Sequence, residues 1–308
     1  MFSVIFPGQG SQIVGMGKEF FDKFNSVKRL FEEADDTLKF SLSSIVLEGP
    51  KDKLDLTANT QPAIFLISYS IFDTMINKFN INLKQAKYFA GHSLGEYSAL
   101  SSAGYLNFSD TIKLLRKRGE AMQNAVPKGE GGMVAVLGTN VEKIENILFE
   151  NKNEFKVQIA NDNSDGQIVC SGKTNDLNKF IEILKKENIK NIRLSVSAPF
   201  HSFLMKNATE IMKIELEKTK FSNVDLKLVS NVTAKEITNK EELKKLLIDQ
   251  IESRVRWRES ILNIIQSGVN QFIEIGPGKV LSGLIKRIDK NIKINTINTE
   301  NDIKDLKI

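Results

Sequence analysis

Gly91-His92-Ser93-Leu94-Gly95 follows the extended run 87–90, and it predicts a serine on a sharp turn between a strand and a helix. The two glycines remove side chains that would clash in a strained turn. The small residues of segment 94–103 are typical of a buried helix. Ser93 is therefore expected at a helix N-terminus, where unpaired N–H groups favour a developing oxyanion. A motif this short also arises by chance, so the flanking strand and helix carry the prediction.

The candidate base for this serine follows from a count of histidines. A serine hydroxyl is a weak nucleophile unless a base accepts its proton. The chain has two histidines, His92 and His201. His92 adjoins Ser93 and is expected to point away from it at a sharp turn, which leaves His201 as the candidate base. The alternative is a loop histidine with structural hydrogen bonds.

Composition bounds the class of protein. The chain has 308 residues, enough for two domains or for one large domain with an insertion. Hydrophobic residues make up 41% and charged residues 26%, as in ordinary soluble proteins. The longest uncharged stretch, 56–72, contains several polar residues and a proline, so it does not predict a membrane span. The start of the chain is expected to be a core strand rather than a signal peptide.

Cysteine and charge content exclude further classes. One cysteine, Cys170, excludes internal disulfides, and with two histidines it argues against a zinc centre. These features favour a cytoplasmic protein. Lys plus Arg exceeds Asp plus Glu by five (43 − 38), but the basic residues are spread along the chain. No basic stripe with aromatic residues predicts nucleic-acid binding, whereas the small positive excess suits an acidic partner protein.

The first third alternates strands and helices. A strand is expected at 2–6, a helix at 19–40 and a strand at Tyr88. Between these, Pro62 is predicted to open a helix that Thr60 caps. A further helix is predicted at 110–126, capped by Ser109 or Asp110. This alternation predicts an α/β fold with a parallel sheet and helices on its faces.

The middle of the chain has a different order. After a Gly-rich break at 127–132, the patterns give the order β-α-β-β-α-β, which is ferredoxin-like. The expected elements are strands 133–137, 157–160, 167–171 and 191–196 and helices 141–151 and 175–186. We therefore predict a small α+β domain at 127–196, inserted into a discontinuous hydrolase-like α/β domain of residues 1–126 and 197–308. In the second part of that domain, strands are expected at 226–230 and 272–275 and helices up to 217, at 241–251 and at 257–266.

A further pattern is formed by segments that are spread along nearly the whole chain. They are Phe6–Gln12, Thr60–Ala63, Gly91–Tyr97, Arg118–Gln123, Ser197–Ser202, Asn231–Thr233, Gln250 with Val255–Trp257, and Glu274–Leu284. In this order and at this spacing, the segments resemble the malonyl-CoA:acyl-carrier-protein transacylases of fatty acid synthesis.

The resemblance implies a role for each matching position. Ser93 would be the nucleophile, and His201 would act first as general base and then as general acid. The backbone N–H groups of Gln9 and Leu94 would form the oxyanion hole. Gln250 would steady His201 through its main-chain carbonyl.

Further positions concern the substrate. Arg118 would bind the free carboxylate of malonate, a role that suits the planar fork of arginine. Asn161 and Asn231 would help to line the cleft between the domains. Phe200 would crowd a substituent on the α-carbon, which favours malonyl over methylmalonyl groups.

The same resemblance implies the partners. Malonyl-CoA and a holo acyl carrier protein would be the substrates, with no metal and no tightly bound cofactor. Because carrier proteins are acidic, Lys190, Lys286 and Arg287 are candidates for steering them. The sequence does not give the oligomeric state, and we expect a monomer. Two departures from the family pattern concern Ser253-Arg254, where a Ser-Pro is common, and Asp162, where an aromatic residue is common.

Several alternatives remain open at this stage. Gln9-Gly10 could form a simple turn, and Arg118 could be a solvated charge beside Arg116 and Lys117. A serine esterase or thioesterase of the α/β-hydrolase type is the chief enzymatic alternative, although its histidine usually lies nearer the C-terminus. An acyltransferase of a polyketide pathway and a non-catalytic docking domain are the others.

Overall fold

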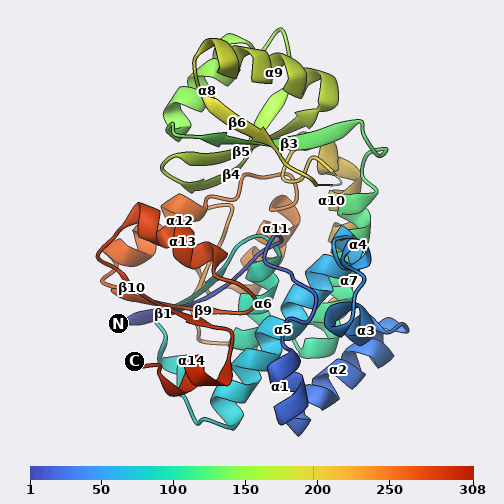
Figure 1. Cartoon of the computed structure of the whole chain (residues 1–308), viewed down its shortest axis with the longest axis vertical. Coiled ribbons are helices and arrows are strands. Elements are labelled where there is room, and N and C mark those ends of the chain that lie inside the picture. Colours follow the sequence, from blue (N-terminus) through green and yellow to red (C-terminus); the bar gives the residue numbers. More distant parts are fainter. Residues whose placement is uncertain (197) are drawn as a thin grey trace.

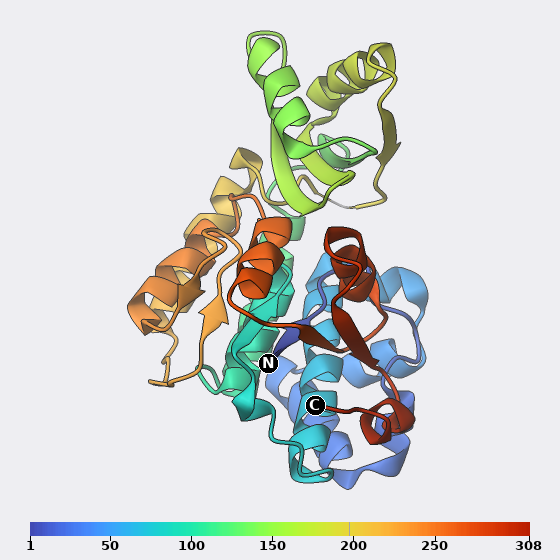
Figure 2. The ribbon, with the colours of Figure 1, turned by 90° about the vertical axis from the view of Figure 1, so that its left-hand side faces the viewer.

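A computed structural model describes residues 1–196 and 198–308. It has a parallel six-stranded sheet with an antiparallel edge strand, and a separate four-stranded antiparallel sheet (Figures 1 and 2). The predicted α/β fold is therefore confirmed at the level of a parallel sheet accompanied by a small antiparallel sheet. Within the described residues, no helix is long and apolar enough to cross a membrane.

The large sheet has the strand order β10-β9-β1-β2-β7-β8, with all neighbours parallel except β7 and β8. Its strands are β1 Phe2–Phe6, β2 Tyr88–Gly91, β7 Leu228–Val229, β8 Glu236–Ile237, β9 Gln271–Ile275 and β10 Lys293–Ile297. β1 and β2 lie in the middle of the sheet and are buried along their whole length. The carboxyl ends of β1, β2 and β7 therefore lie side by side, where ligands bind in open α/β sheets.

Helices surround this sheet (Figure 1). They are α1 Lys18–Lys23, α2 Asn25–Leu38, α3 Leu42–Leu47, α4 Lys51–Leu54, α5 Thr57–Asn77, α6 Leu94–Ala103, α7 Phe108–Gln123, α10 Lys206–Lys218, α11 Lys240–Asp249, α12 Trp257–Gln266, α13 Val280–Ile288 and α14 Glu300–Lys304, with short 3-10 turns η1 Leu83–Gln85 and η2 Phe203–Met205. Every residue of α6 is buried, as its small side chains predict. This burial fixes the helix that begins directly after Ser93.

Three of the predicted helices differ from the structure. The helix expected at 19–40 is divided, because Phe24 is extended between α1 and α2. The helix expected to open at Pro62 begins at Thr57, with Pro62 inside it. Proline frees the carbonyl four residues earlier, and here Arg116 Nη1 donates to that Ala58 oxygen at 3.2 Å, which compensates for the lost hydrogen bond. The cap of α7 is Asn107 rather than Ser109 or Asp110.

The small sheet has the order β4-β5-β3-β6 and is antiparallel throughout. Its elements are β3 Gly131–Leu137, α8 Val141–Glu150, β4 Val157–Ser164, β5 Gln167–Lys173, α9 Thr174–Lys186 and β6 Lys190–Arg193. α8 and α9 lie on the face away from the large sheet (Figures 1 and 2). Val134 and Val136 pack in the core under these helices, whereas Met133 and Ala135 belong to the core of the large part. Alternate residues of β3 thus pack on opposite faces of the small sheet, one set in the core under α8 and α9 and the other in the core of the large part.

β4 pairs with the segment between α11 and α12 and so connects the small sheet to the large part of the fold. Val255 donates its N–H to Ala160 O at 2.8 Å, and Asp162 donates its N–H to Val255 O at 3.0 Å. Asp162 is 1% exposed in its side chain and forms an ion pair with Arg258 of α12. Asp162 therefore links the two parts through an ion pair, at a position where an aromatic residue is common in the family pattern. Ser197, the first residue of the second predicted segment of the large domain, lies outside the described residues.

Candidate active site

Ser93 occupies a strained turn between β2 and α6, as the motif predicts. Its backbone has φ 54° and ψ −110°, in a region that residues with a side chain rarely adopt. The glycines serve close packing rather than this dihedral: a Cβ on Gly91 would lie 1.9 Å from the oxygen of Gly95, and one on Gly95 would lie 2.3 Å from the oxygen of Phe6. The motif therefore lets β1, β2 and α6 approach closely while the strain falls on Ser93.

Three adjacent strand ends converge at this turn. Gln9 follows β1, Ser93 follows β2 and Asn231 follows β7. Asn231 Oδ1 accepts a hydrogen bond from the Ser93 N–H at 2.7 Å, and its Nδ2 donates to the oxygen of Gly91 at 2.7 Å. Asn231 therefore holds the turn from behind, because its amide bonds to the backbone on both sides of His92.

His201 lies next to Ser93. Its Nε2 is 2.8 Å from Ser93 Oγ, and its Nδ1 is 2.9 Å from the main-chain oxygen of Gln250. A carbonyl can only accept a hydrogen bond, so Nδ1 carries the proton and Nε2 is left as the acceptor for the serine hydroxyl. Burial, and then the charge of Arg118, lower the pKa of His201 to about 3. The imidazole is therefore neutral at neutral pH.

The segment that carries His201 is fixed from the small sheet. Ser171 of β5 donates its hydroxyl to the oxygen of Phe200 at 2.6 Å. Ser202 donates its hydroxyl to Pro199 O at 2.7 Å. His201 itself has φ 55° and is 3% exposed. Both members of the Ser93–His201 pair thus have a positive φ, which the surrounding structure must enforce.

Arg118 is fully buried, with 0% exposure, so the alternative of a solvated helix charge is wrong. Its Nη2 donates to Ser93 Oγ at 3.0 Å and to Gln250 Oε1 at 2.8 Å, and its Nη1 donates to Gln61 Oε1 at 2.8 Å. Among the residues that the structure describes, no carboxylate pairs with the guanidinium and Nε has no acceptor. These hydrogen bonds of the buried cation therefore go only to neutral oxygen atoms, and none of them neutralises its charge.

A glycine explains how α5 reaches this arginine. A Cβ on Gly119 of α7 would lie 2.5 Å from the oxygen of Thr57 on α5. The missing side chain lets the two helices cross closely, and Gln61 of α5 thereby reaches Arg118. Gln61 lay within a matching motif, but sequence reasoning gave it no role. Its amide side chain within the matching segment Thr60–Ala63 was the available signal.

A cavity of about 220 Å³ opens in front of Ser93. Both parts of the fold line it: Gly8, Gln9, Gln61, His92, Ser93, Leu94, Arg118, Met122, Met133, Ala135, Asn161, Asn163, Gln167, Val169, Leu194, Val196, Phe200, His201, Val280, Leu281 and Leu284. The residues of α13 that line it are apolar, the small sheet contributes both apolar and amide side chains, and the surroundings of Ser93 are polar. The N–H of Leu94 opens α6 and has no acceptor within that helix.

The cavity brings together most of the predicted site residues, but two lie behind it. Asn231 was expected to line the cleft, whereas it is fully buried and bonded to the turn. Gln250 is also fully buried, and it contacts His201 and Arg118 from behind. His92 points away from Ser93, as predicted, with Nε2 2.8 Å from Asn163 Oδ1.

The candidate docking residues do not form one cluster. Lys286 Nζ donates to the oxygen of Ile292 at 2.6 Å, which ties it to the end of α13. Arg287 Nη1 donates to Gln167 Oε1 at 2.6 Å and so lies beside a residue of the cavity wall. Lys190 is exposed on β6, at the sheet edge opposite β4. Arg287 is thus the candidate that the fold places at the cavity.

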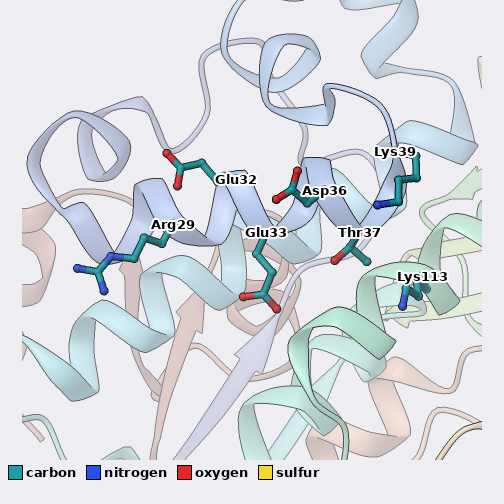
Figure 3. Close-up of a pocket in the computed structure, with 7 residues that line it drawn as sticks. All are labelled: Arg29, Glu32, Glu33, Asp36, Thr37, Lys39 and Lys113. Atoms are coloured by element: carbon teal, nitrogen blue, oxygen red, sulfur yellow. The ribbon is translucent and has the colours of Figure 1, made fainter.

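Another hollow carries charged side chains of both signs. It is lined by Arg29, Glu32, Glu33, Asp36, Thr37, Lys39 and Lys113 (Figure 3). Figure 3 shows most of them projecting from α2, and none belongs to the predicted site. Within the described part of the chain, no group of three or more His, Cys, Asp or Glu side chains could hold a metal ion.

Comparison with known proteins places the chain in a family. Residues 3–303 match the acyl transferase domain family. The malonyl CoA-acyl carrier protein transacylase of Bacillus subtilis (strain 168) is 44% identical over 97% of this chain and 98% of its own length. The transacylase of that name from Haemophilus influenzae is 39% identical over 96% of this chain and 95% of its own length.

Solved structures agree with this match. The acyl-carrier-protein S-malonyltransferase of Bartonella henselae superposes with a TM-score of 0.95 at 44% identity, covering 98% of this chain and 97% of that one. A malonyl transacylase solved with a type II polyketide acyl carrier protein gives a TM-score of 0.93 at 36% identity, covering 98% and 97%. The chain is therefore an acyltransferase, and it belongs to the acyl transferase domain family with the malonyl-CoA:acyl-carrier-protein transacylases.

Proposed function

We propose that this protein transfers the malonyl group of malonyl-CoA to the phosphopantetheine thiol of an acyl carrier protein, through an ester on Ser93. The observation that carries the proposal is the position of Arg118. Its buried guanidinium donates to Ser93 Oγ at 3.0 Å and has no carboxylate partner in the described residues. A malonyl group on Ser93 would bring a free carboxylate to this charge. Neutral acyl groups would leave it unpaired.

In the first half-reaction, Nε2 of His201 accepts the Ser93 proton while Oγ attacks the thioester carbon. The N–H groups of Gln9 and Leu94 stabilise the oxyanion. The tetrahedral intermediate collapses with cleavage of the C–S bond, and the proton on His201 passes to the CoA sulfur. Gln250 O accepts from Nδ1–H throughout, in the place that a carboxylate takes in a conventional triad.

In the second half-reaction, the carrier thiol gives its proton to His201 and attacks the malonyl ester. The intermediate releases Ser93, whose oxygen recovers the proton from His201. Water must be kept from the ester in between. The mostly apolar wall of the cavity and the paired carboxylate support that protection, since they leave little room for an attacking water.

The finer description of the fold is also proposed. Residues 1–126 and 197–308 would form a discontinuous hydrolase-like domain, and residues 127–196 a ferredoxin-like domain that covers the site. The element order β3-α8-β4-β5-α9-β6 supports the second assignment. The nucleophile turn after the central strand β2 supports the first.

The partners follow from the reaction. A holo carrier protein would dock at the cavity mouth, with Arg287 steering its acidic surface and Lys286 and Lys190 contributing less directly. A related malonyl transacylase solved with its carrier protein supports such a complex. We further propose that the protein works as a cytoplasmic monomer without a tightly bound cofactor.

The test is a transfer assay with malonyl-CoA and holo carrier protein. The proposal predicts malonyl carrier protein, with little free malonate. A serine esterase or thioesterase would instead release malonate and would hydrolyse p-nitrophenyl esters at comparable rates. Fatty acid and polyketide carrier proteins supplied in parallel would identify the physiological acceptor, which we propose to be the fatty acid carrier.

A further inference from the structure

Glu96 is a buried carboxylate at the third position of α6, with 1% exposure. Its Oε2 accepts hydrogen bonds from Gln250 Nε2 at 2.7 Å and from the Asn231 N–H at 3.1 Å, and the Ser230 hydroxyl also bonds to it. In the part of the chain that the structure describes, no lysine or arginine pairs with it directly, and it does not line the cavity. Burying a carboxylate in this way is costly, so the arrangement calls for a reason.

Two of the residues that Glu96 contacts, Gln250 and Asn231, hold the reacting groups. Gln250 accepts from Arg118 through Oε1 at 2.8 Å and donates to the oxygen of Ser93 through Nε2 at 3.1 Å. Asn231 accepts from the N–H of Ser93. Glu96 is therefore one hydrogen-bonded step from Arg118 and from the strained turn.

Three groups orient the Gln250 amide: Arg118 donates to its oxygen, and Ser93 O and Glu96 accept from its nitrogen. The oxygen and nitrogen ends of this amide have nearly the same shape, so hydrogen-bond partners decide which end faces Arg118. An ionised carboxylate can only accept, so Glu96 draws the NH₂ group to itself. The opposite orientation would set the Gln250 oxygen against the carboxylate and its NH₂ against the guanidinium.

We infer that Glu96 is a positioning residue that orients the Gln250 amide, and through it aims the Arg118 guanidinium at the acyl group on Ser93. The inference rests on the proposed function and adds a residue to the apparatus that selects an acidic acyl group. Glu96 itself touches neither the cavity nor the reacting atoms.

The test uses Glu96→Leu, which removes the acceptor at similar volume, and Glu96→Gln, which keeps an acceptor for Gln250 and offers its own NH₂ to Ser230. Loading of Ser93 is timed separately with malonyl-CoA and acetyl-CoA. We expect Glu96→Leu to lower the malonyl-over-acetyl ratio of loading rates by about tenfold, the loss of one hydrogen bond to a charged group. Glu96→Gln is expected to restore most of that ratio.

Glu274→Leu is the matched control. Glu274 is also fully buried, and it accepts from the N–H groups of Leu281 and Ser282 at the start of α13, away from Arg118. Its loss is expected to weaken the fold and to affect both CoA esters equally, because its hydrogen bonds to α13 do not involve Arg118, Gln250 or Ser93. An unchanged ratio in Glu96→Leu, or an equal drop in Glu274→Leu, would overturn the inference. Absence of any malonyl adduct on the parent protein would instead defeat the proposed function.

If Glu96→Leu does not fold, the pH dependence of the malonyl-over-acetyl loading ratio provides a second test of the inference. Burial raises the pKa of Glu96 to about 7. The charged and titratable groups that face it are Arg118 and Tyr97, and burial raises the pKa of Tyr97 to about 12. Neither changes charge between pH 6 and 8. In the parent the malonyl-over-acetyl ratio should therefore fall as the pH drops below about 7, because protonated Glu96 orients Gln250 less firmly. In Glu96→Gln the ratio should stay constant, and a constant ratio in both proteins would refute the inference.

Discussion

The Nη2 atom of Arg118 lies 3.0 Å from Oγ of Ser93, so a buried positive charge faces the oxygen that would carry the acyl group. The same charge is the second cause, after burial, that keeps His201 neutral. The side chain that we propose to select the acyl group thus also affects the protonation state of His201.

Arg118→Lys should lose the preference for malonyl groups although the charge is kept. An ammonium has no planar fork and cannot bond to Gln61, Gln250 and a carboxylate in the same geometry. We expect malonyl loading to fall about ten- to a hundredfold, as for the loss of a hydrogen bond to a charged group. Acetyl loading, timed in parallel by rapid quench, should change far less. Equal losses with both esters would contradict this role.

Phe200→Ser should relax discrimination against methylmalonyl-CoA. Phe200 lines the cavity, and its loss would make room for a substituent on the α-carbon. The measurement is the ratio of kcat/KM for the two esters. Phe203→Ser is a suitable control, because Phe203 is half-buried and does not belong to the cavity wall. If the ratio is the same in the parent and in Phe200→Ser, Phe200 does not set this selectivity.

Because His201 is buried in its neutral form, the free energy of unfolding should decrease as the pH is lowered. The pKa of His201 is lowered to about 3 in the folded protein, against 6.5 for an unperturbed histidine. Between these two pH values, His201 binds a proton in the unfolded chain but stays neutral in the folded protein. The free energy of unfolding therefore declines as the pH falls from about 6.5 toward 3. Between neutral pH and pH 5, this loss is on the order of 2 kcal/mol.

Urea unfolding of the parent and of His201→Gln at pH 7.5 and pH 5 isolates this effect. Glutamine does not titrate, so the parent should lose stability relative to the variant at the lower pH. A difference between the two proteins that does not change with pH would show that His201 has no lowered pKa.

Arg287→Glu should impair the second half-reaction selectively. The reversed charge lies beside Gln167 at the cavity and should repel an acidic carrier protein, which raises its KM. Loading from malonyl-CoA should be spared. Lys84→Glu is the control, because it makes the same charge change on the exposed turn η1, before the amino end of β2 and away from the carboxyl end that carries Ser93. An equal effect of the two substitutions would count against docking at Arg287.

The sequence predicted the architecture well where its signals are local. Trp257–Gln266 is a helix with the expected bounds, and the β-α-β-β-α-β order of the middle segment is the observed one. Prediction from the sequence failed where tertiary contacts determine the bounds of a helix or strand. The strand expected at 226–230 is only Leu228–Val229, and Pro62 lies inside α5 because Arg116 satisfies the freed carbonyl.

The site shows the same division. Ser93 and its turn could be predicted from neighbouring residues, and His201 from the scarcity of histidine. The burial of Arg118 could not be predicted from the sequence, because this burial depends on the close crossing of α5 and α7 at Gly119. The contacts of Glu96 with Gln250 and Asn231 join three distant segments, and no local pattern in the sequence records them.

Intact mass spectrometry after incubation with malonyl-CoA tests the central claim most directly. The account predicts one malonyl adduct on the parent protein, none on Ser93→Ala, and discharge of the adduct by holo carrier protein but not by apo carrier protein. An adduct of the same size on Ser93→Ala, or CoA release with no adduct on the parent, would contradict a malonyl ester on Ser93 as the intermediate.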